Sequence, residues 1–151
     1  MTTNKTIPIL LVVLVAAGAA AWWQFGAPQP VVENTGNAVQ KAGLIRVTSP
    51  RPNSTVESPL TITGQARGYW YFEASFPVVL VDWDGRIIAQ GIATAKDEWM
   101  TEDFVPFEAT LTFVADKNAY SNRGSLILQK DNPSGLPEYD DALEIPVLFA
   151  R

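Results

Sequence analysis

Three stretches of the chain alternate between apolar and polar residues, the pattern of a β-strand with one face in a core. Residues 60–66 place Leu, Ile, Gly and Ala on one side and Thr, Thr and Gln on the other. Residues 107–113 and 143–149 repeat this period of two. Residues 78–81 are apolar on both sides, which predicts a strand at the centre of its sheet. Pro146 cannot donate a ladder hydrogen bond, so the last strand is expected at an edge or kinked there.

Turn-forming residues separate these stretches. Asp84-Gly85 lies between two apolar runs and is typical of a hairpin with a type I′ turn. Together the signals predict about seven strands, near residues 44–48, 59–66, 77–83, 86–94, 107–114, 124–130 and 142–149. Seven short strands without helical periodicity predict an all-β fold, an immunoglobulin-like β-sandwich, over residues 43–151.

The amino-terminal part has a different pattern. Residues 7–25 carry no charge, and as a helix they would span about 28 Å, close to the hydrocarbon core of a bilayer. Lys5 before this run and Trp22 and Trp23 at its far end favour a retained membrane anchor with its amino terminus in the cytoplasm. Residues 19–21 are three alanines and also fit a signal-peptide cleavage site, which leaves a cleaved signal as the alternative.

Residues 26–42 are rich in proline and glycine and show no sustained period. We expect a flexible linker there, with a root-mean-square reach of about 20–25 Å. The predicted organisation is an anchor or signal segment at 1–25, a linker at 26–42 and a β-sandwich domain at 43–151. The domain is expected on the extracytoplasmic side of a single-pass cell-membrane protein, or secreted if the first segment is cleaved.

Composition removes several kinds of chemistry. The 151 residues include no cysteine and no histidine, and the net charge is −5. Disulfides, thiolate zinc sites, thiol nucleophiles and imidazole-dependent triads are therefore excluded. The acidic balance disfavours nucleic acid as a partner. We predict no enzyme activity, no cofactor and no metal site, and we expect Trp83 or Trp99 to fill the core in place of a disulfide.

The acidic residues allow two further hypotheses. Residues 82–85 read Asp-Trp-Asp-Gly, as in part of a calcium loop, but counting twelve residues from Asp82 ends on Ala93, which cannot close such a loop. A hairpin turn is favoured there. The acidic pairs at 97–98, 102–103 and 140–141 are most simply a solvated surface. A composite calcium site built from Asp97, Glu98 and Asp140 stays open.

An aromatic cluster, Tyr69-Trp70-Tyr71-Phe72, is the strongest candidate for binding. On a strand, neighbouring residues face opposite sides, so at least one pair is expected to point outward and to stack on a sugar or a protein. The alternative is a core residue plus a cross-strand pair, or an aromatic lid over one end of the sandwich. Gly68 and Pro77 flank the cluster, which favours a loop or an edge excursion. The candidate ligand-binding residues are Tyr69, Trp70 and Tyr71.

Several segments resemble a known family. Residues 45–66 read IRVTSPRPNSTVESPLTITGQA, residues 79–85 read VLVDWDG, and GSLIL and IPV follow at 124–128 and 145–147. These segments resemble the immunoglobulin-like domain of bacterial spore germination, often found beside the germination and sporulation module of envelope proteins. The resemblance implies a sandwich fold and an extracytoplasmic location, and it brings no catalytic residues. The chain departs from a common family arrangement, because it shows neither that module nor a second domain.

Two functional hypotheses follow. The first is a non-enzymatic extracytoplasmic binding or scaffold domain, tethered to the bacterial cell membrane through its amino-terminal helix and recognising an envelope protein. The second is a module that binds a cell-wall glycan, such as peptidoglycan, through the aromatic cluster at residues 69–72.

Overall fold

The strands predicted from the alternating pattern are present in the computed structural model, which describes residues 34–150. The predicted amino-terminal helix lies outside the described residues, as does the linker up to residue 33. Within residues 34–150, no helix combines the length and the apolar character needed to cross a membrane. The described strands are β1 (Ile45–Ser49), β2 (Thr55–Val56), β3 (Leu60–Arg67), β4 (Ser75–Asp82), β5 (Ile87–Ala95), β6 (Phe104–Leu111), β7 (Arg123–Gln129) and β8 (Ala142–Phe149). The short helices are α2 (Ala38–Lys41) and two 3-10 turns, η1 (Gly68–Trp70) and η2 (Pro137–Tyr139).

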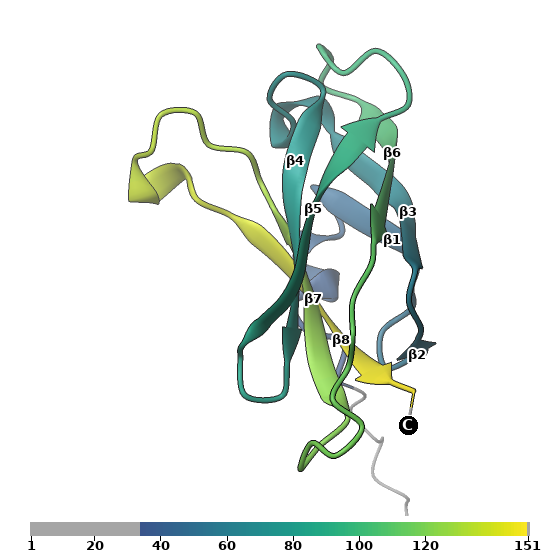
Figure 1. Ribbon diagram of the computed structural model, residues 1–151. Coiled ribbons are helices and arrows are strands. Elements are labelled where there is room, and N and C mark those ends of the chain that lie inside the picture. The colour runs from purple at the N-terminus through teal and green to yellow at the C-terminus, as the bar shows by residue number, and fades with distance from the viewer. Residues whose placement is uncertain (1–33, 151) are drawn as a thin grey trace, which may run out of the picture. The chain divides into compact units, whose positions relative to one another are not determined.

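All eight strands belong to one sheet, in the order β1-β3-β6-β5-β4-β7-β8-β2 (Figure 1). The all-β class is confirmed, but the sheet is continuous where two separate sheets were expected. The join is narrow: β5 pairs with β6 only at Thr94↔Glu108 and Ala95↔Phe107. The sheet curls, and its two arms enclose the core (Figure 1).

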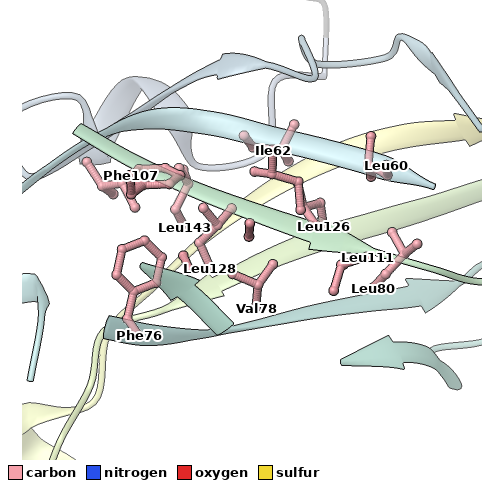
Figure 2. Packing of buried hydrophobic residues seen from close by; sticks show 14 of the residues in the cluster. Leu60, Ile62, Phe76, Val78, Leu80, Phe107, Leu111, Leu126, Leu128 and Leu143 are labelled. Atoms are coloured by element: carbon pink, nitrogen blue, oxygen red, sulfur yellow. The ribbon is translucent and has the colours of Figure 1, made fainter. Parts of the chain in front are cut away.

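The inward residues of both arms meet in a single hydrophobic cluster (Figure 2). The predicted alternation is confirmed, since β3, β6 and β8 bury every second residue. The predicted central position of residues 78–81 is also confirmed, because β4 pairs with β5 on one side and β7 on the other. The short strand β2 was not predicted. Its two residues pair in parallel with Leu148 and Phe149 of β8.

Pro146 lies at a position of β8 where no neighbouring strand needs a hydrogen bond from its nitrogen. Its carbonyl oxygen accepts a hydrogen bond from the backbone N–H of Asn53 (2.7 Å), so its nitrogen also points to the outer side of β8. Within the described chain, the only strand that pairs with β8 on that side is the two-residue β2, which lies beyond Pro146. The last strand therefore lies next to the edge of the sheet, close to the prediction.

Residues 34–42 belong to the folded unit, which begins at Asn34, although their composition is that of a linker. Asn37 covers the outer edge of β8. Its side-chain amide donates to the carbonyl of Ala142 (2.9 Å), and its Oδ1 accepts from the N–H of Glu144 (2.8 Å). Gly36 (φ 63°) permits this contact, because a Cβ there would lie 2.0 Å from the Glu144 carbonyl oxygen.

The β4–β5 hairpin is at the predicted place, but its turn type is not the predicted one. A type I′ turn needs positive φ at two central residues, whereas Gly85 has φ of 76° and Asp84 does not take a positive φ. The N–H groups of Asp84 and Arg86 both donate to Oδ1 of Asp82, each at 3.0 Å. This side-chain cap stabilises a three-residue loop in which one glycine supplies the left-handed position.

Candidate functional site

The aromatic cluster lies on the loop between β3 and β4. The chain turns through η1 here, so the residues do not alternate as on a strand. Two of them point outward, with Tyr69 51% and Phe72 41% exposed, while Trp70 is 0% and Tyr71 4% exposed. Of the three candidate binding residues, only Tyr69 therefore presents its ring to solvent. The other two form the alternative considered from sequence, aromatic residues of the core.

Trp70 is the tryptophan that fills the core, and the expectation for Trp83 or Trp99 was wrong. Trp83 is exposed and Trp99 packs only partly against the core. The neighbouring core residues also pack through their rings. The ring of Tyr71 contacts that of Phe76, with centroids 5.2 Å apart, and the rings of Phe76 and Phe107 pack edge to face, with centroids 5.0 Å apart. The indole N–H of Trp70 has no hydrogen-bond partner among the described residues.

Tyr71 is anchored by a buried hydrogen bond from its hydroxyl to the carbonyl oxygen of Val105 (2.7 Å). Burial raises the pKa of Tyr71 above its ordinary value, and a backbone hydrogen bond at Ala66 opposes this rise only partly. The folded state therefore holds the phenol proton more tightly than the unfolded state. The stabilisation is complete below the pKa of an unfolded tyrosine, about 10, and is lost as the pH rises toward the folded value.

Replacing Tyr71 with phenylalanine is expected to cost about 1 kcal/mol of unfolding free energy at neutral pH, because a buried hydrogen bond is lost. The difference between wild type and variant is expected to shrink above a pH of about 10, since the variant has no phenol to ionise. Urea unfolding of both proteins at about pH 7 and about pH 11 checks this. A difference that stays constant across this range would contradict the assignment.

The cluster is held against a second loop, residues 96–103. The N–H of Gly68 donates to the carbonyl of Asp103 (3.1 Å), and the N–H of Ala95 donates to the carbonyl of Ala74 (2.8 Å). A Cβ at Gly68 would lie 1.8 Å from the carbonyl oxygen of Thr101. Residues 68–74 and 96–103 thus form one surface at one end of the sheet, which we call the loop end. Its exposed large hydrophobic side chains are Tyr69, Phe72 and Met100.

The loop end is strongly acidic. The segments 68–74 and 96–103 carry a net charge of −4, from one basic residue, Lys96, and five acidic residues. The acidic residues are Glu73, Asp97, Glu98, Glu102 and Asp103. Lys96 reaches Glu108 outside these segments, at 3.7 Å. The neighbouring Arg67 places its guanidinium over the ring of Phe104 (4.1 Å). An apolar surface surrounded by carboxylates is suited to a partner with exposed basic and apolar groups.

The acidic residues do not gather into a metal site in the part of the chain that the structure describes. Over residues 34–150, no group of three or more Asp or Glu side chains is placed to hold a metal ion, so the composite calcium site does not form. Asp140 accepts a hydrogen bond from Asn132 (2.7 Å), and Asp141 pairs with Lys41. Both aspartates line an open hollow of about 600 Å³ at the base of the segment 130–141, which projects from the sheet (Figure 1).

Asp82 is committed to its own turn. It pairs with Arg86 (2.8 Å) in addition to capping the hairpin. Desolvation acts to raise the pKa of Asp82, but hydrogen bonds from the backbone and side chain of Arg86 and from the backbone of Asp84 outweigh it and lower the pKa below its ordinary value. The Asp-Trp-Asp-Gly sequence therefore makes a hairpin, as the counting argument favoured.

A second exposed apolar surface lies at the opposite end of the sheet, and no sequence pattern indicated it. We call it the hairpin end and define it by Trp83, Ile87, Val114 and Tyr120. The rings of Trp83 and Tyr120 contact each other, with centroids 5.6 Å apart. Hollows of about 290 Å³ and about 410 Å³ adjoin this ring pair, and both are lined by Trp83 and Ser121. The only signal in the sequence was the presence of large apolar residues in polar loops.

Comparison with known proteins agrees with the fold. Residues 44–135 match the family model of the immunoglobulin-like domain of bacterial spore germination. The chain therefore belongs to this family, as the resemblance of its segments implied. No curated protein and no solved structure matches the chain.

Proposed function

We propose that the chain is a non-enzymatic binding or scaffold domain of the bacterial envelope, held at the outer face of the cell membrane by residues 1–25. In this proposal the loop end binds an envelope protein with a basic and apolar surface. The observation that carries the proposal is the joint exposure of Tyr69, Phe72 and Met100 among carboxylates, on loops fixed by a buried tryptophan. Loops held by a rigid sandwich are a common place for recognition.

A protein partner fits the loop end better than a glycan. Sugar stacking needs flat aromatic faces open to solvent, and two of the three candidate residues are buried. Stable protein interfaces instead combine exposed aromatic and methionine side chains with complementary charge. The glycan hypothesis remains the alternative outcome of the experiment below.

The position of the chain entry supports the proposed tether. Asn34, the first described residue, lines the same hollow as Trp83 and Tyr120. β4 starts next to the loop end at Ser75 and finishes at Asp82 beside that hollow. The chain thus enters the folded unit at the end opposite to the loop end. An anchor upstream of Asn34 leaves the loop end free for a partner.

Site-specific crosslinking in intact envelopes tests this function. A photoreactive amino acid replaces Met100 at the loop end or, as control, the equally exposed Val39 on α2. We expect a discrete adduct from position 100 and none from position 39. The adduct is expected to fall a few-fold with Glu102→Lys, because a complementary charge is reversed. Glu57→Lys, the same change at an exposed site outside the loop end, should leave it unchanged.

Equal labelling from both positions, or none from either, would contradict the proposal. An adduct whose apparent mass falls on digestion with a muramidase would favour the glycan hypothesis. An adduct insensitive to Glu102→Lys would remove the electrostatic part of the recognition.

A further inference from the structure

We propose that the hairpin end rests on the surface of the phospholipid bilayer in which the chain is anchored. This inference depends on the anchor in the proposed function. It assigns a second surface of the molecule to a second partner, and it fixes which way the domain faces.

The side chains at the hairpin end suit the interface between lipid and water. Val114 is 87% and Tyr120 88% exposed, and the exposed Trp83 and Ile87 lie at the same end. Exposed apolar residues grouped in this way mark interaction sites in soluble domains. Tryptophan and tyrosine in particular concentrate at the headgroup layer of membranes, because each ring has an apolar body and a polar edge.

Chain connectivity brings this end close to the membrane. Asn34 is held beside the ring pair, where its carbonyl oxygen accepts a hydrogen bond from Asn53 (2.6 Å). Residues 26–33 separate it from the apolar run 7–25. Eight residues can reach about 30 Å at full extension and less in other conformations. With the anchor in the bilayer, this short connection keeps Asn34, and the hairpin end beside it, within about 30 Å of the apolar run.

The charge distribution favours the same orientation. The segments 82–88 and 113–124 carry three acidic and three basic residues, so the hairpin end is neutral: Asp82, Asp84 and Asp116 against Arg86, Lys117 and Arg123. The loop end carries −4 from one basic and five acidic residues. Anionic lipids repel the acidic end and not the neutral one. Electrostatics and apolar exposure therefore select the same face for the membrane.

The absence of cysteine allows a direct test with the full chain. Single cysteines at Tyr120, or at Met100 as the loop-end control, carry a fluorophore in protein reconstituted in phosphatidylethanolamine and phosphatidylglycerol vesicles. We expect the label at 120 to be quenched by lipids with a nitroxide near the headgroup and to be shielded from iodide in the water. The label at 100 is expected to behave in the opposite way.

A label at 120 that iodide reaches as freely as the label at 100 would overturn the inference. A label at 120 that is quenched neither by the nitroxide lipids nor by iodide would also overturn the inference. Such a result indicates that a protein or a second copy of the chain covers this surface. Flotation of the vesicles after a carbonate wash separates the two proposals. Protein that does not float contradicts the anchor itself, whereas protein that floats with its 120 label in water contradicts only the docking.

A substitution gives an independent readout. Val114→Asp places a charge at an exposed position of the hairpin end and is expected to make the label at 120 accessible to iodide. Val39→Asp introduces the same charge at an exposed position on α2 and is expected to leave the label shielded. Equal effects of the two variants would overturn the inference.

Discussion

Replacing Trp70 with alanine is expected to lower the free energy of unfolding by about 3–5 kcal/mol, the usual cost of deleting a large buried aromatic side chain. Trp70 is fully enclosed, and its carbonyl accepts the N–H of Asp131 (3.0 Å), so it supports both the aromatic corner and the projecting segment. In a thermal melt the midpoint should fall by about 10–20 °C. Tyr69→Ala, the exposed neighbour, should change stability by less than about 1 kcal/mol.

The variant Trp70→Phe distinguishes the two contributions to this stability change, the cavity left by the ring and the loss of the buried indole N–H. The indole N–H is buried without a partner in the described chain, and an unsatisfied buried donor is itself destabilising. Phenylalanine removes this donor and retains most of the apolar volume, so we expect it to cost much less than alanine. A Trp70→Ala protein as stable as Tyr69→Ala would contradict the core position of Trp70.

This result determines how binding data are interpreted. A loss of ligand binding in Trp70→Ala would report a damaged fold, because the ring has no exposed surface. Tyr69→Ala removes a side chain that is open to solvent and leaves the core intact. It is therefore the informative substitution for both the protein and the glycan hypotheses.

The strands could be predicted because their signal is local. Each of β3, β6 and β8 buries alternate residues. A half-buried strand needs apolar residues at every second position, so its own sequence shows the period of two. β2 has no such pattern. Its two residues are defined by the distant β8, through the pairs Thr55↔Leu148 and Val56↔Phe149.

The candidate site was harder to predict because distant contacts decide it. Alternation of residues 69–72 assumes an extended strand, and the packing of Gly68 against residues 99–101 turns the chain into η1 instead. Distant contacts also explain why residues 34–42 belong to the folded unit although they have the composition of a linker. Asn37 is held there by hydrogen bonds to Ala142 and Glu144 of β8. The hairpin end joins Trp83 and Tyr120 from separate loops, and no periodicity connects them.

Gly68→Ala is expected to separate the two loops of the loop end. An added Cβ would lie 1.8 Å from the carbonyl oxygen of Thr101 and 2.3 Å from that of Trp99. Both are backbone atoms, so no side chain can rotate to relieve the overlap. Overpacking of this kind costs about 1–3 kcal/mol. Hydrogen exchange over residues 96–103 should become faster, while exchange in β7 and β8 should remain slow.

Gly43→Ala is the matched control, because a Cβ at Gly43 meets no atom within 4 Å. If the two variants melt and exchange alike, the packing of Gly68 against residues 99–101 is wrong. If only Gly68→Ala loosens the loop, crosslinking from the photoreactive residue at position 100 should fall although that residue itself is the same in both proteins. The partner would then be recognising the fixed arrangement of the two loops, since the same exposed side chains would still be present on a looser frame.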